Sequence, residues 1–370
     1  DYSFAYGPHI GRAAEWRLAK EVARRHDLEV VTAWPMPALG VDCFVMQARG
    51  PATIPALAAE IARDPRVESA QAMNVFKGFG QGDPLSPLQP VVRLWHIEEI
   101  HRLATGRNVR IAEVDSAVEL DHPDLRGRVA AERDFIGDAP AIGEVHGTAV
   151  AGIIAARVGD GIGIAGVAPD ASLVALRACR QTTPSSTSIC TSFTLAKALQ
   201  YALDQDVQVI NLSLGGPSDA LLARLIDVAT ARHIIVVAAA DPESPDGGFP
   251  ASHRGVLAVA AAGAQNAPEH ALVAPGRDIP ATMPGRSWGF VNGSSFAAAE
   301  VSGVVALVLE RAPGSDADAV RRMLTAEKAS DARNHPPAMV DICSAMARLA
   351  GTCACGCSVV ARDVDPDSAH

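Results

Sequence analysis

The sequence predicts an α/β protein with a large doubly wound, mostly parallel sheet, preceded by a small α+β module of ferredoxin-like type. Beyond residue 92, continuous apolar runs alternate with segments of helical periodicity, which is typical of parallel strands covered by helices on both faces. Before residue 80, three shorter strand patterns are interleaved with two helical ones. Between these regions, glycine and proline cluster over 78–90 and indicate a domain boundary.

The front module covers residues 1–82, and its elements follow from periodicity and from start and stop signals. Pro51 and Thr53 mark the beginning of its second helix, and Asp64 with Pro65 marks the end. We expect, in chain order, a helix over 13–25, strands over 28–34 and 41–48, a helix over 53–63 and a closing strand over 66–76.

The main domain covers residues 83–350, and residues 351–370 form a cysteine-containing tail. Its strands are predicted where apolar runs are continuous, because such strands are buried on both faces of a sheet. These strands are expected over 109–114, 172–177, 207–212, 234–240 and 256–262. The helices are expected over 146–156, 193–205, 221–232, 316–326 and 338–349.

Composition and charge exclude several classes of protein. The 370 residues are 48% hydrophobic and 20% charged, which argues against intrinsic disorder and provides for a large core. The formal net charge of -10 disfavours nucleic acid as a partner. The longest apolar runs fall short of the roughly 20 residues that cross a bilayer, so we expect no membrane span.

Three polar residues stand where an apolar element meets a glycine-containing turn. Asp115 follows the strand over 109–114, and His146 and Ser295 each begin a helix. Each residue alone has an ordinary explanation, as a turn residue, a surface histidine or a helix cap. A serine nucleophile, however, needs a base within reach and an acid that orients the base. The chain order Asp, His, Ser in an α/β protein therefore indicates a catalytic triad.

Beyond these three residues, the sequence resembles the subtilisin-like serine peptidases, the subtilases, over nearly all of 83–350. DSAVELDHPDL over 115–125 is similar to the family's catalytic-aspartate motif, and HGTAVAG over 146–152 is similar to its histidine motif. Further similar segments are GVAP at 166–169, VINLSLGGP at 209–217, APG at 274–276 and GSSFAA at 293–298.

The resemblance implies a serine endopeptidase that hydrolyses protein or peptide substrates through an acyl-enzyme. Ser295 would be the nucleophile, His146 the general base and then acid, and Asp115 the group that orients the imidazole. The front module resembles the family's inhibitory prodomain, which implies a zymogen whose own prodomain inhibits it. The alternative is an unrelated binding module that is never removed.

The resemblance also implies a substrate cleft made of small and apolar residues. Its two walls would be Ser213, Leu214, Gly215 and Gly216, and Ala238, Ala239 and Ala240. Without an acid at its base, this pocket would prefer an uncharged, fairly large side chain. Ser188 and Ile189 would offer a backbone edge to an extended substrate. The alternative is that these small residues only allow tight packing of the sheet.

One departure from the family pattern concerns the oxyanion region, which we place at Asp241, Pro242 and the backbone N–H of Ser295. The family has Gly-Asn where this chain has Asp241 and Pro242, so the donor amide of that asparagine is missing. In a member of this family, removing that donor costs roughly a hundredfold to a thousandfold in rate. Ala299 and Glu300 likewise replace a family Pro-His pair. These departures favour a second hypothesis, a catalytically impaired homologue that binds peptides or proteins.

The chemistry itself requires no cofactor, but the resemblance implies a structural calcium ion. VGDGIGI over 158–164 is similar to the family's calcium loop. The ligands would be oxygen atoms, which suit a hard cation, from Asp124, Asp160, Ile162 and Ile164. The alternative is that both carboxylates are simply solvated.

Seven cysteines leave at least one without an intramolecular partner. Cys179 and Cys190 flank a polar loop near the predicted substrate edge, and we expect a disulfide between them. Disulfides rather than a zinc site are expected for Cys343, Cys353, Cys355 and Cys357. Cys43 is then left over. We expect a secreted or periplasmic protein, and because the chain begins at Asp1 we expect that an upstream segment was removed or omitted.

Overall fold

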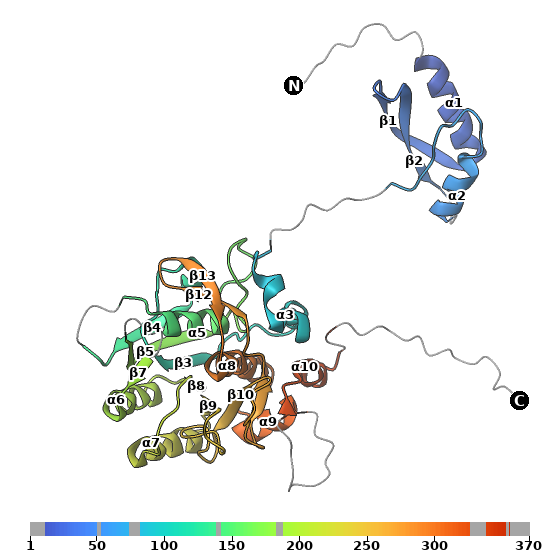
Figure 1. Cartoon of the computed structure of the whole chain (residues 1–370). Coiled ribbons are helices and arrows are strands. Elements are labelled where there is room, and N and C mark those ends of the chain that lie inside the picture. Colours follow the sequence, from blue (N-terminus) through green and yellow to red (C-terminus); the bar gives the residue numbers. More distant parts are fainter. Residues whose placement is uncertain are drawn as a thin grey trace, which may run out of the picture. The chain divides into compact units, whose positions relative to one another are not determined.

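The computed structural model describes residues 12–49, 53–73, 82–137, 142–182, 188–325, 338–352 and 355. The chain divides into two compact units, Asp1–Gly80 and Gln81–His370 (Figure 1). Each unit has buried apolar side chains of its own.

The described part of the front unit contains two helices and a two-stranded antiparallel sheet. Its elements are α1 (Arg12–Arg25), β1 (Leu28–Met36), β2 (Val41–Ala48) and α2 (Ile54–Ile61). The strands pair from Leu28 opposite Ala48 to Met36 opposite Val41. The buried side chains of α1 are Ala19, Val22 and Ala23. The two helices and first two strands predicted for this module are confirmed.

The closing strand predicted over 66–76 is wrong for the residues that the structure describes. Residues 66–73 form turns and irregular backbone, whereas 74–76 lie outside the described residues. Asp64 begins a turn here. Its side chain accepts the N–H of Arg66 at 3.0 Å, and its carbonyl oxygen accepts the N–H of Val67 at 2.9 Å. These two N–H groups are therefore not available to pair with a neighbouring strand. The ferredoxin-like arrangement therefore stays a prediction.

The described part of the second unit is built on an eight-stranded sheet whose neighbouring strands are all parallel. The strands are β3 (Arg110–Asp115), β4 (Val129–Asp134), β5 (Ser172–Arg177), β8 (Val209–Leu212), β9 (Ile235–Ala239), β10 (Leu257–Ala261), β11 (Leu272–Ala274) and β14 (Ala338–Met339). Their order across the sheet is β14-β11-β10-β9-β8-β3-β5-β4. From β3 the chain goes to the edge strand β4, returns to β5, and then continues on the other side of β3 from β8 outward to β14. The predicted doubly wound, mostly parallel fold is confirmed.

Helices cover both faces of this sheet (Figure 1). One face carries α5 (Val145–Ala155) and α8 (Ser294–Arg311), which pack together in one buried apolar cluster. The other face carries α6 (Ser192–Leu203) and α7 (Ala220–Ala231), which belong to a second cluster. Shorter helices on the α8 side are α3 (Pro90–Leu94), α4 (Ile97–Ile100), α9 (Ala317–Leu324) and α10 (Ile342–Ala350), and short 3-10 helices span Ser86–Leu88 and Pro123–Leu125.

Helix α8 is buried along most of its length, because its side chains are apolar or small on nearly every side. Gly303 allows the closest approach: a Cβ there would lie 2.6 Å from Cβ of Val167. In the described ranges, no helix combines the length and the apolar character that are needed to cross a membrane. Helix α8 packs against the sheet, and its first residues, which include Ser295, lie at the sheet edge where β8 ends.

The helix predicted over 338–349 is wrong at its beginning. Residues 338–339 form the edge strand β14, which pairs with β11, and α10 starts only at Ile342. The side chain of Asp341 accepts the N–H of Ser344 at 2.9 Å and so caps α10. The sequence patterns did not predict β4, β11 or two short hairpins, formed by β6 (Cys179–Gln181) with β7 (Ser188–Cys190) and by β12 (Ile279–Met283) with β13 (Ser287–Val291).

Candidate active site

Asp115 and His146 lie together at the carboxyl edge of the parallel sheet. Asp115 is the last residue of β3, and His146 is the second residue of α5. Nδ1 of His146 lies 2.8 Å from Oδ1 and 2.9 Å from Oδ2 of Asp115, whose side chain is buried. Burial alone would lower the pKa of His146, but the Asp115 charge and this hydrogen bond outweigh burial and raise the pKa above its usual value.

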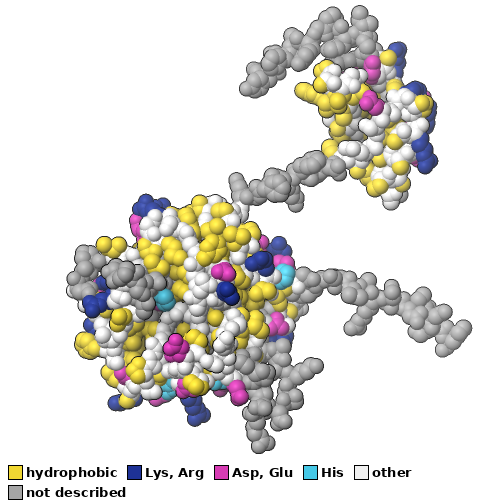
Figure 2. Space-filling model, viewed as in Figure 1, with side chains coloured by type: hydrophobic (Ala, Val, Ile, Leu, Met, Phe, Trp, Pro, Cys, Tyr) yellow, Lys and Arg dark blue, Asp and Glu magenta, His cyan; other side chains and the backbone are white. Residues whose placement is uncertain are grey.

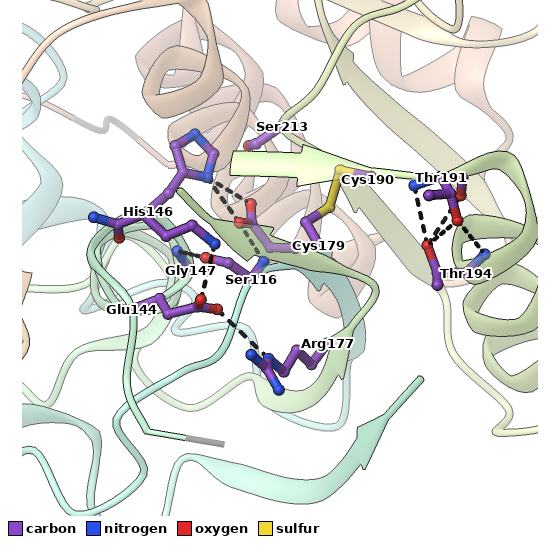
Figure 3. Close-up of a disulfide and its surroundings, with 12 residues drawn as sticks. Ser116, Glu144, His146, Gly147, Arg177, Cys179, Cys190, Thr191, Thr194 and Ser213 are labelled. Atoms are coloured by element: carbon purple, nitrogen blue, oxygen red, sulfur yellow. Dashed lines mark hydrogen bonds and ion pairs between the residues drawn. A yellow bond between two sulfur atoms is a disulfide. The ribbon is translucent and has the colours of Figure 1, made fainter. Parts of the chain in front are cut away.

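Backbone contacts join the segments that carry this pair. The N–H of Ser116 donates to Oδ1 of Asp115 at 2.6 Å, and the N–H of Gly147 donates to Oγ of Ser116 at 3.0 Å. Position 147 requires glycine, because a Cβ there would lie 2.4 Å from the carbonyl oxygen of Ser116. The loop after Asp115 and the helix start around His146 are therefore in direct contact (Figure 3).

Ser295 lies in the first turn of α8, after Gly293, whose φ of 132° favours glycine. Its Oγ donates to the carbonyl oxygen of Ser213 at 2.9 Å, and Oγ of Ser213 donates to the carbonyl oxygen of Ser295 at 2.7 Å. Within the described residues, no hydrogen bond joins Ser295 to His146. The ring centroids of His146 and Phe296 lie 5.2 Å apart, so the residue that follows Ser295 lies beside the imidazole.

A buried polar network supports Ser213. Nδ2 of Asn211 donates to Oγ of Ser213 at 3.0 Å, and Oγ of Ser302 donates to Oδ1 of Asn211 at 2.8 Å. Asn211 and Ser302 are fully buried, and Ser302 belongs to the same helix as Ser295. Sequence reasoning missed both residues. The available signal was an asparagine within an apolar strand, because a buried amide needs hydrogen-bond partners.

Comparison with known proteins identifies the family. The Subtilase family pattern matches residues 106–340, a range that contains Asp115, His146 and Ser295. The chain belongs to the subtilase family. It is 33% identical to subtilisin E of Bacillus subtilis (strain 168) over 273 residues, which cover 69% of this chain and 68% of that relative. It is 35% identical over 224 residues to the major intracellular serine protease of the same organism, covering 55% and 69%.

Solved structures share the fold of this subtilase. A protease of Pseudoalteromonas arctica PAMC 21717 superimposes with a TM-score of 0.63 at 23% identity and covers 72% of this chain and 98% of its own. The prenylagaramide maturation protease PagA superimposes with a TM-score of 0.56 at 24% identity, covering 70% and 99%. These two likenesses concern the fold alone. Family membership makes this subtilase a serine endopeptidase, a hydrolase that acts on peptide bonds.

The pair of Asp241 and Pro242 forms a tight turn in this subtilase. Oδ1 of Asp241 accepts the N–H of Glu243 at 2.9 Å, and its Oδ2 accepts the hydroxyl of Ser244 at 3.1 Å. The N–H of Asp241 donates to the carbonyl oxygen of Gly247 at 2.8 Å, and proline has no N–H. Both side-chain oxygens of Asp241 accept hydrogen bonds within this turn, so in this arrangement the side chain offers no donor to an oxyanion. The oxyanion region predicted here stays a prediction.

The residues predicted to line the cleft follow two neighbouring strands. Those after β8 are Ser213, Leu214, Gly215 and Gly216, and those at the end of β9 are Ala238, Ala239 and Ala240. Because β8 and β9 are hydrogen-bonded to each other, the two segments lie side by side. The two glycines are exposed and the three alanines are buried. The structure thus brings the two predicted walls together, and their contact with substrate stays a prediction.

Ser188 and Ile189 lie on β7, in the hairpin formed by β6 and β7. The disulfide predicted between Cys179 and Cys190 is present, and it joins the two strands of this hairpin (Figure 3). Ile189 is 52% exposed. Among the described strands, β7 pairs with β6 alone, so no described strand pairs with its other edge.

The remaining cysteines lie in different parts of the chain. A second disulfide joins Cys343 of α10 to Cys355. Cys43 in the front unit is free and exposed, as predicted. Cys353 and Cys357 lie outside the described residues.

The predicted calcium ligands include one buried oxygen without a partner. Oδ2 of Asp124 accepts the N–H of Ile164 at 3.1 Å and the indole N–H of Trp288 at 2.7 Å, whereas its buried Oδ1 has no hydrogen-bond partner. Oδ1 of Asp160 accepts the N–H of Ile162 at 3.2 Å. Across the described ranges, no group of three or more His, Cys, Asp and Glu side chains is placed to hold a metal. A cation here would therefore depend on backbone oxygens as well as on Asp124.

Proposed function

We propose that this subtilase cleaves peptide bonds through an acyl-enzyme formed on Ser295, with His146 as the proton carrier and Asp115 as its orienting carboxylate. The observation that supports this proposal best is the contact of both Asp115 oxygens with Nδ1 of His146, at 2.8 and 2.9 Å. When Nδ1 carries the proton that this carboxylate accepts, Nε2 of the neutral imidazole remains a base.

The reaction would begin when Nε2 of His146 takes the hydroxyl proton of Ser295 and the serine oxygen attacks the substrate carbonyl carbon. For this step the hydroxyl must leave the carbonyl oxygen of Ser213 and turn toward the imidazole. The imidazolium then protonates the leaving amine, the C–N bond breaks, and an ester remains on Ser295. Water that is deprotonated by the same imidazole hydrolyses this ester and restores the hydroxyl.

The developing oxyanion would be stabilised by the backbone N–H of Ser295. This group lies in the first turn of α8, where N–H groups have no partner within the helix. Asp241 and Pro242 supply no second donor, so we expect slow turnover. The same observation favours the second candidate function, a catalytically impaired homologue whose cleft binds peptides or proteins.

Labelling with a fluorophosphonate probe distinguishes the two candidates. The probe should label Ser295 in the full chain and more rapidly in residues 83–370, and it should not label the Ser295→Ala variant. If a folded preparation of residues 83–370 is not labelled, the binding function replaces the enzymatic one.

The cleft would take protein or peptide substrates in an extended conformation. The free edge of β7 would pair with the substrate backbone, and we call the β6–β7 pair the substrate hairpin. The walls after β8 and β9 contain no charged side chain, so an uncharged, fairly large substrate residue would be preferred before the scissile bond. Cleavage of a peptide library would measure this preference.

The front unit would act as an inhibitory prodomain, so that the protein is made as a zymogen. Hydrophobic side chains are exposed on this unit (Figure 2), and the large ones on β1 and the turn after it are Val31, Trp34, Met36 and Leu39. Trp34 is 70% exposed, and an exposed group of large apolar side chains on β1 and its turn supports a protein partner for this part of the front unit. Mass spectrometry of the purified protein would detect removal of residues 1–82.

A calcium ion would have a structural role, held by Asp124, Asp160 and the carbonyl oxygens of Ile162 and Ile164. The unpartnered Oδ1 of Asp124 supports such a site. A secreted or periplasmic location is supported by the two disulfides, because disulfides persist in oxidising compartments.

A further inference from the structure

Glu144 lies directly before the helix that carries His146, and its side chain is 16% exposed. It exchanges two hydrogen bonds with Ala117, which lies two residues after Asp115. Oε2 of Glu144 accepts the N–H of Ala117 at 2.7 Å, and the N–H of Glu144 donates to the carbonyl oxygen of Ala117 at 2.8 Å. Glu144 therefore ties the loop after the carboxylate to the helix start that carries the imidazole.

The other oxygen of Glu144 contacts the substrate hairpin. Oε1 of Glu144 accepts the N–H of Gln181, the last residue of β6, at 2.8 Å. The side chain of Gln181 returns the contact, because its Oε1 accepts the N–H of Val145 at 2.9 Å. Two hydrogen bonds thus join the hairpin to the two residues that precede His146.

A cation lies beside this carboxylate. Nε of Arg177, at the end of β5, lies 3.6 Å from Oε2 of Glu144 (Figure 3). Nη1 of Arg177 also donates to Oδ2 of Asp134 at 3.0 Å. Hydrogen bonds from backbone N–H groups to a carboxylate are about twice as strong as neutral ones, and here a cation balances the charge. The contacts of Glu144 therefore form a strong and well-defined link.

We propose that Glu144 is a positioning residue that couples the substrate hairpin to the Asp115–His146 pair. The inference rests on the proposed function, because it gives Glu144 a part in the same site. The contact of Ser116 with Gly147 holds the segment on one side of His146, and the contacts of Glu144 hold it on the other. A displacement of reacting groups by about 1 Å can cost about a hundredfold in rate, so this link affects turnover although Glu144 touches no reacting atom.

The test uses Glu144→Gln, which keeps the shape of the side chain but replaces one acceptor oxygen by an NH2 donor that would face a backbone N–H. We expect kcat/KM for an extended, uncharged peptide to fall about tenfold to a hundredfold. We also expect slower fluorophosphonate labelling of Ser295. Both measurements use the full chain and the chain without residues 1–82.

The matched control is Glu310→Gln, at the far end of α8. Oε2 of Glu310 also accepts backbone N–H groups, at 2.7, 2.7 and 2.9 Å from Thr105, Gly106 and Arg107. We expect both variants to lower the midpoint of thermal unfolding, but only Glu144→Gln to lower kcat/KM. The proposal is overturned if Glu144→Gln loses stability and keeps kcat/KM within about twofold of the wild type, as the control should.

A spectroscopic measurement separates this inference from the proposed function. In a Ser295→Ala background, the downfield proton resonance of His146 Nδ1–H reports its hydrogen bond to Asp115 without turnover. Glu144→Gln should shift or broaden this resonance, and Glu310→Gln should leave it unchanged. An unchanged resonance in Glu144→Gln overturns the positioning role. If the resonance shifts in Glu144→Gln but the probe fails to label the protein that retains Ser295, only the proposed function is contradicted.

Discussion

Ser213 and Ser295 exchange two hydrogen bonds, each hydroxyl donating to the other residue's carbonyl oxygen, at 2.7 and 2.9 Å. The pair joins the end of β8 to the first turn of α8. This contact fixes the backbone that carries the proposed nucleophile, while its hydroxyl donates to a neutral carbonyl oxygen that it must leave during the proposed reaction. Ser213 is thus both a wall of the predicted cleft and a support for Ser295.

Ser213→Ala should lower kcat/KM about fivefold, because one hydrogen bond of about 1 kcal/mol to the carbonyl oxygen of Ser295 is lost. Steady-state kinetics with a chromogenic peptide would measure the change. Ser302→Ala is the control, since Ser302 contacts Asn211 but not Ser295. It should lower stability with a smaller effect on kcat/KM. Equal kinetic losses in both variants would contradict a specific role for Ser213.

The pH dependence of kcat/KM should report the raised pKa of His146. Because neutral imidazole is the proposed base, activity should fall as the pH decreases through a midpoint above 6.5, the ordinary value for histidine. Asp115→Asn removes the charge that raises this pKa, so the midpoint should move to lower pH. In a Ser-His-Asp peptidase the equivalent change costs about ten-thousandfold in kcat. An unshifted midpoint in this variant would show that Asp115 does not set the pKa.

The same pKa shift has a consequence for stability. The folded-state pKa of His146 lies above its unfolded value, so protonation favours the folded state. This contribution is complete below the unfolded pKa and is lost as the pH rises through the folded pKa. Urea unfolding of the wild type and of Asp115→Asn across this pH range would measure it.

Glu113→Gln should stabilise the protein at neutral pH. Glu113 is fully buried on β3, and burial, followed by the nearby Asp115 charge, raises its pKa well above the usual value. The unfolded chain releases this proton above about pH 4.3, whereas the folded chain keeps it, so stability falls as the pH rises above that value. The amide keeps the shape of the protonated carboxyl and removes this loss.

The gain from Glu113→Gln should be seen in urea unfolding at pH 7 and should vanish below about pH 4, where both states are protonated. Glu300→Gln should behave alike, because burial also raises the pKa of Glu300 well above its usual value. Glu310→Gln should do the reverse and destabilise, since it loses acceptors for backbone N–H groups. A destabilised Glu113→Gln at pH 7 would contradict the interpretation.

The sequence predicts the central sheet well because its strands are continuous apolar runs. The expected strand over 172–177 matches β5, and β3, β8, β9 and β10 differ from prediction only at their ends. Short elements at the edges were missed, because three residues of β11 or two of β14 carry no usable periodicity. Their pairing depends on the neighbouring strand, as in the contact of Val340 N–H with the carbonyl oxygen of Val273 at 3.0 Å.

The parts of the candidate site that lie in sequence motifs could be predicted. The parts that depend on contacts between segments distant in the sequence could not. Residue type, order and position at element ends indicated Asp115, His146 and Ser295, and the structure shows that Asp115 and His146 are in contact. Glu144 was not found, because a glutamate before a helix is an ordinary residue. Its part depends on contacts with Ala117 and with the substrate hairpin, which only the folded chain shows.

Calcium removal should lower the thermal unfolding midpoint if the ion is held as proposed. Saturation at a hundred times the dissociation constant contributes about 2.7 kcal/mol, so addition of a chelator should remove a contribution of this size. Asp124→Asn should abolish the response to chelator. Asp121→Asn is the control, because Asp121 forms an ion pair with Arg286 at the surface. A chelator response that persists in Asp124→Asn would place the ion elsewhere.

The two disulfides should differ in their effect on substrate binding although they close loops of similar length. Sequence separations of 11 and 12 residues predict similar losses of stability, about 3 kcal/mol each, when either pair is replaced by serine. Only the pair of Cys179 and Cys190 lies in the substrate hairpin, where it joins β6 to the strand with the free edge. Replacing this pair should therefore raise KM for an extended peptide, whereas replacing Cys343 and Cys355 should leave KM unchanged. The fluorophosphonate labelling rate provides the internal comparison, because a small probe does not need the edge of β7. A rise in KM that matches in both variants would mean that general destabilisation, and not the hairpin, controls substrate binding.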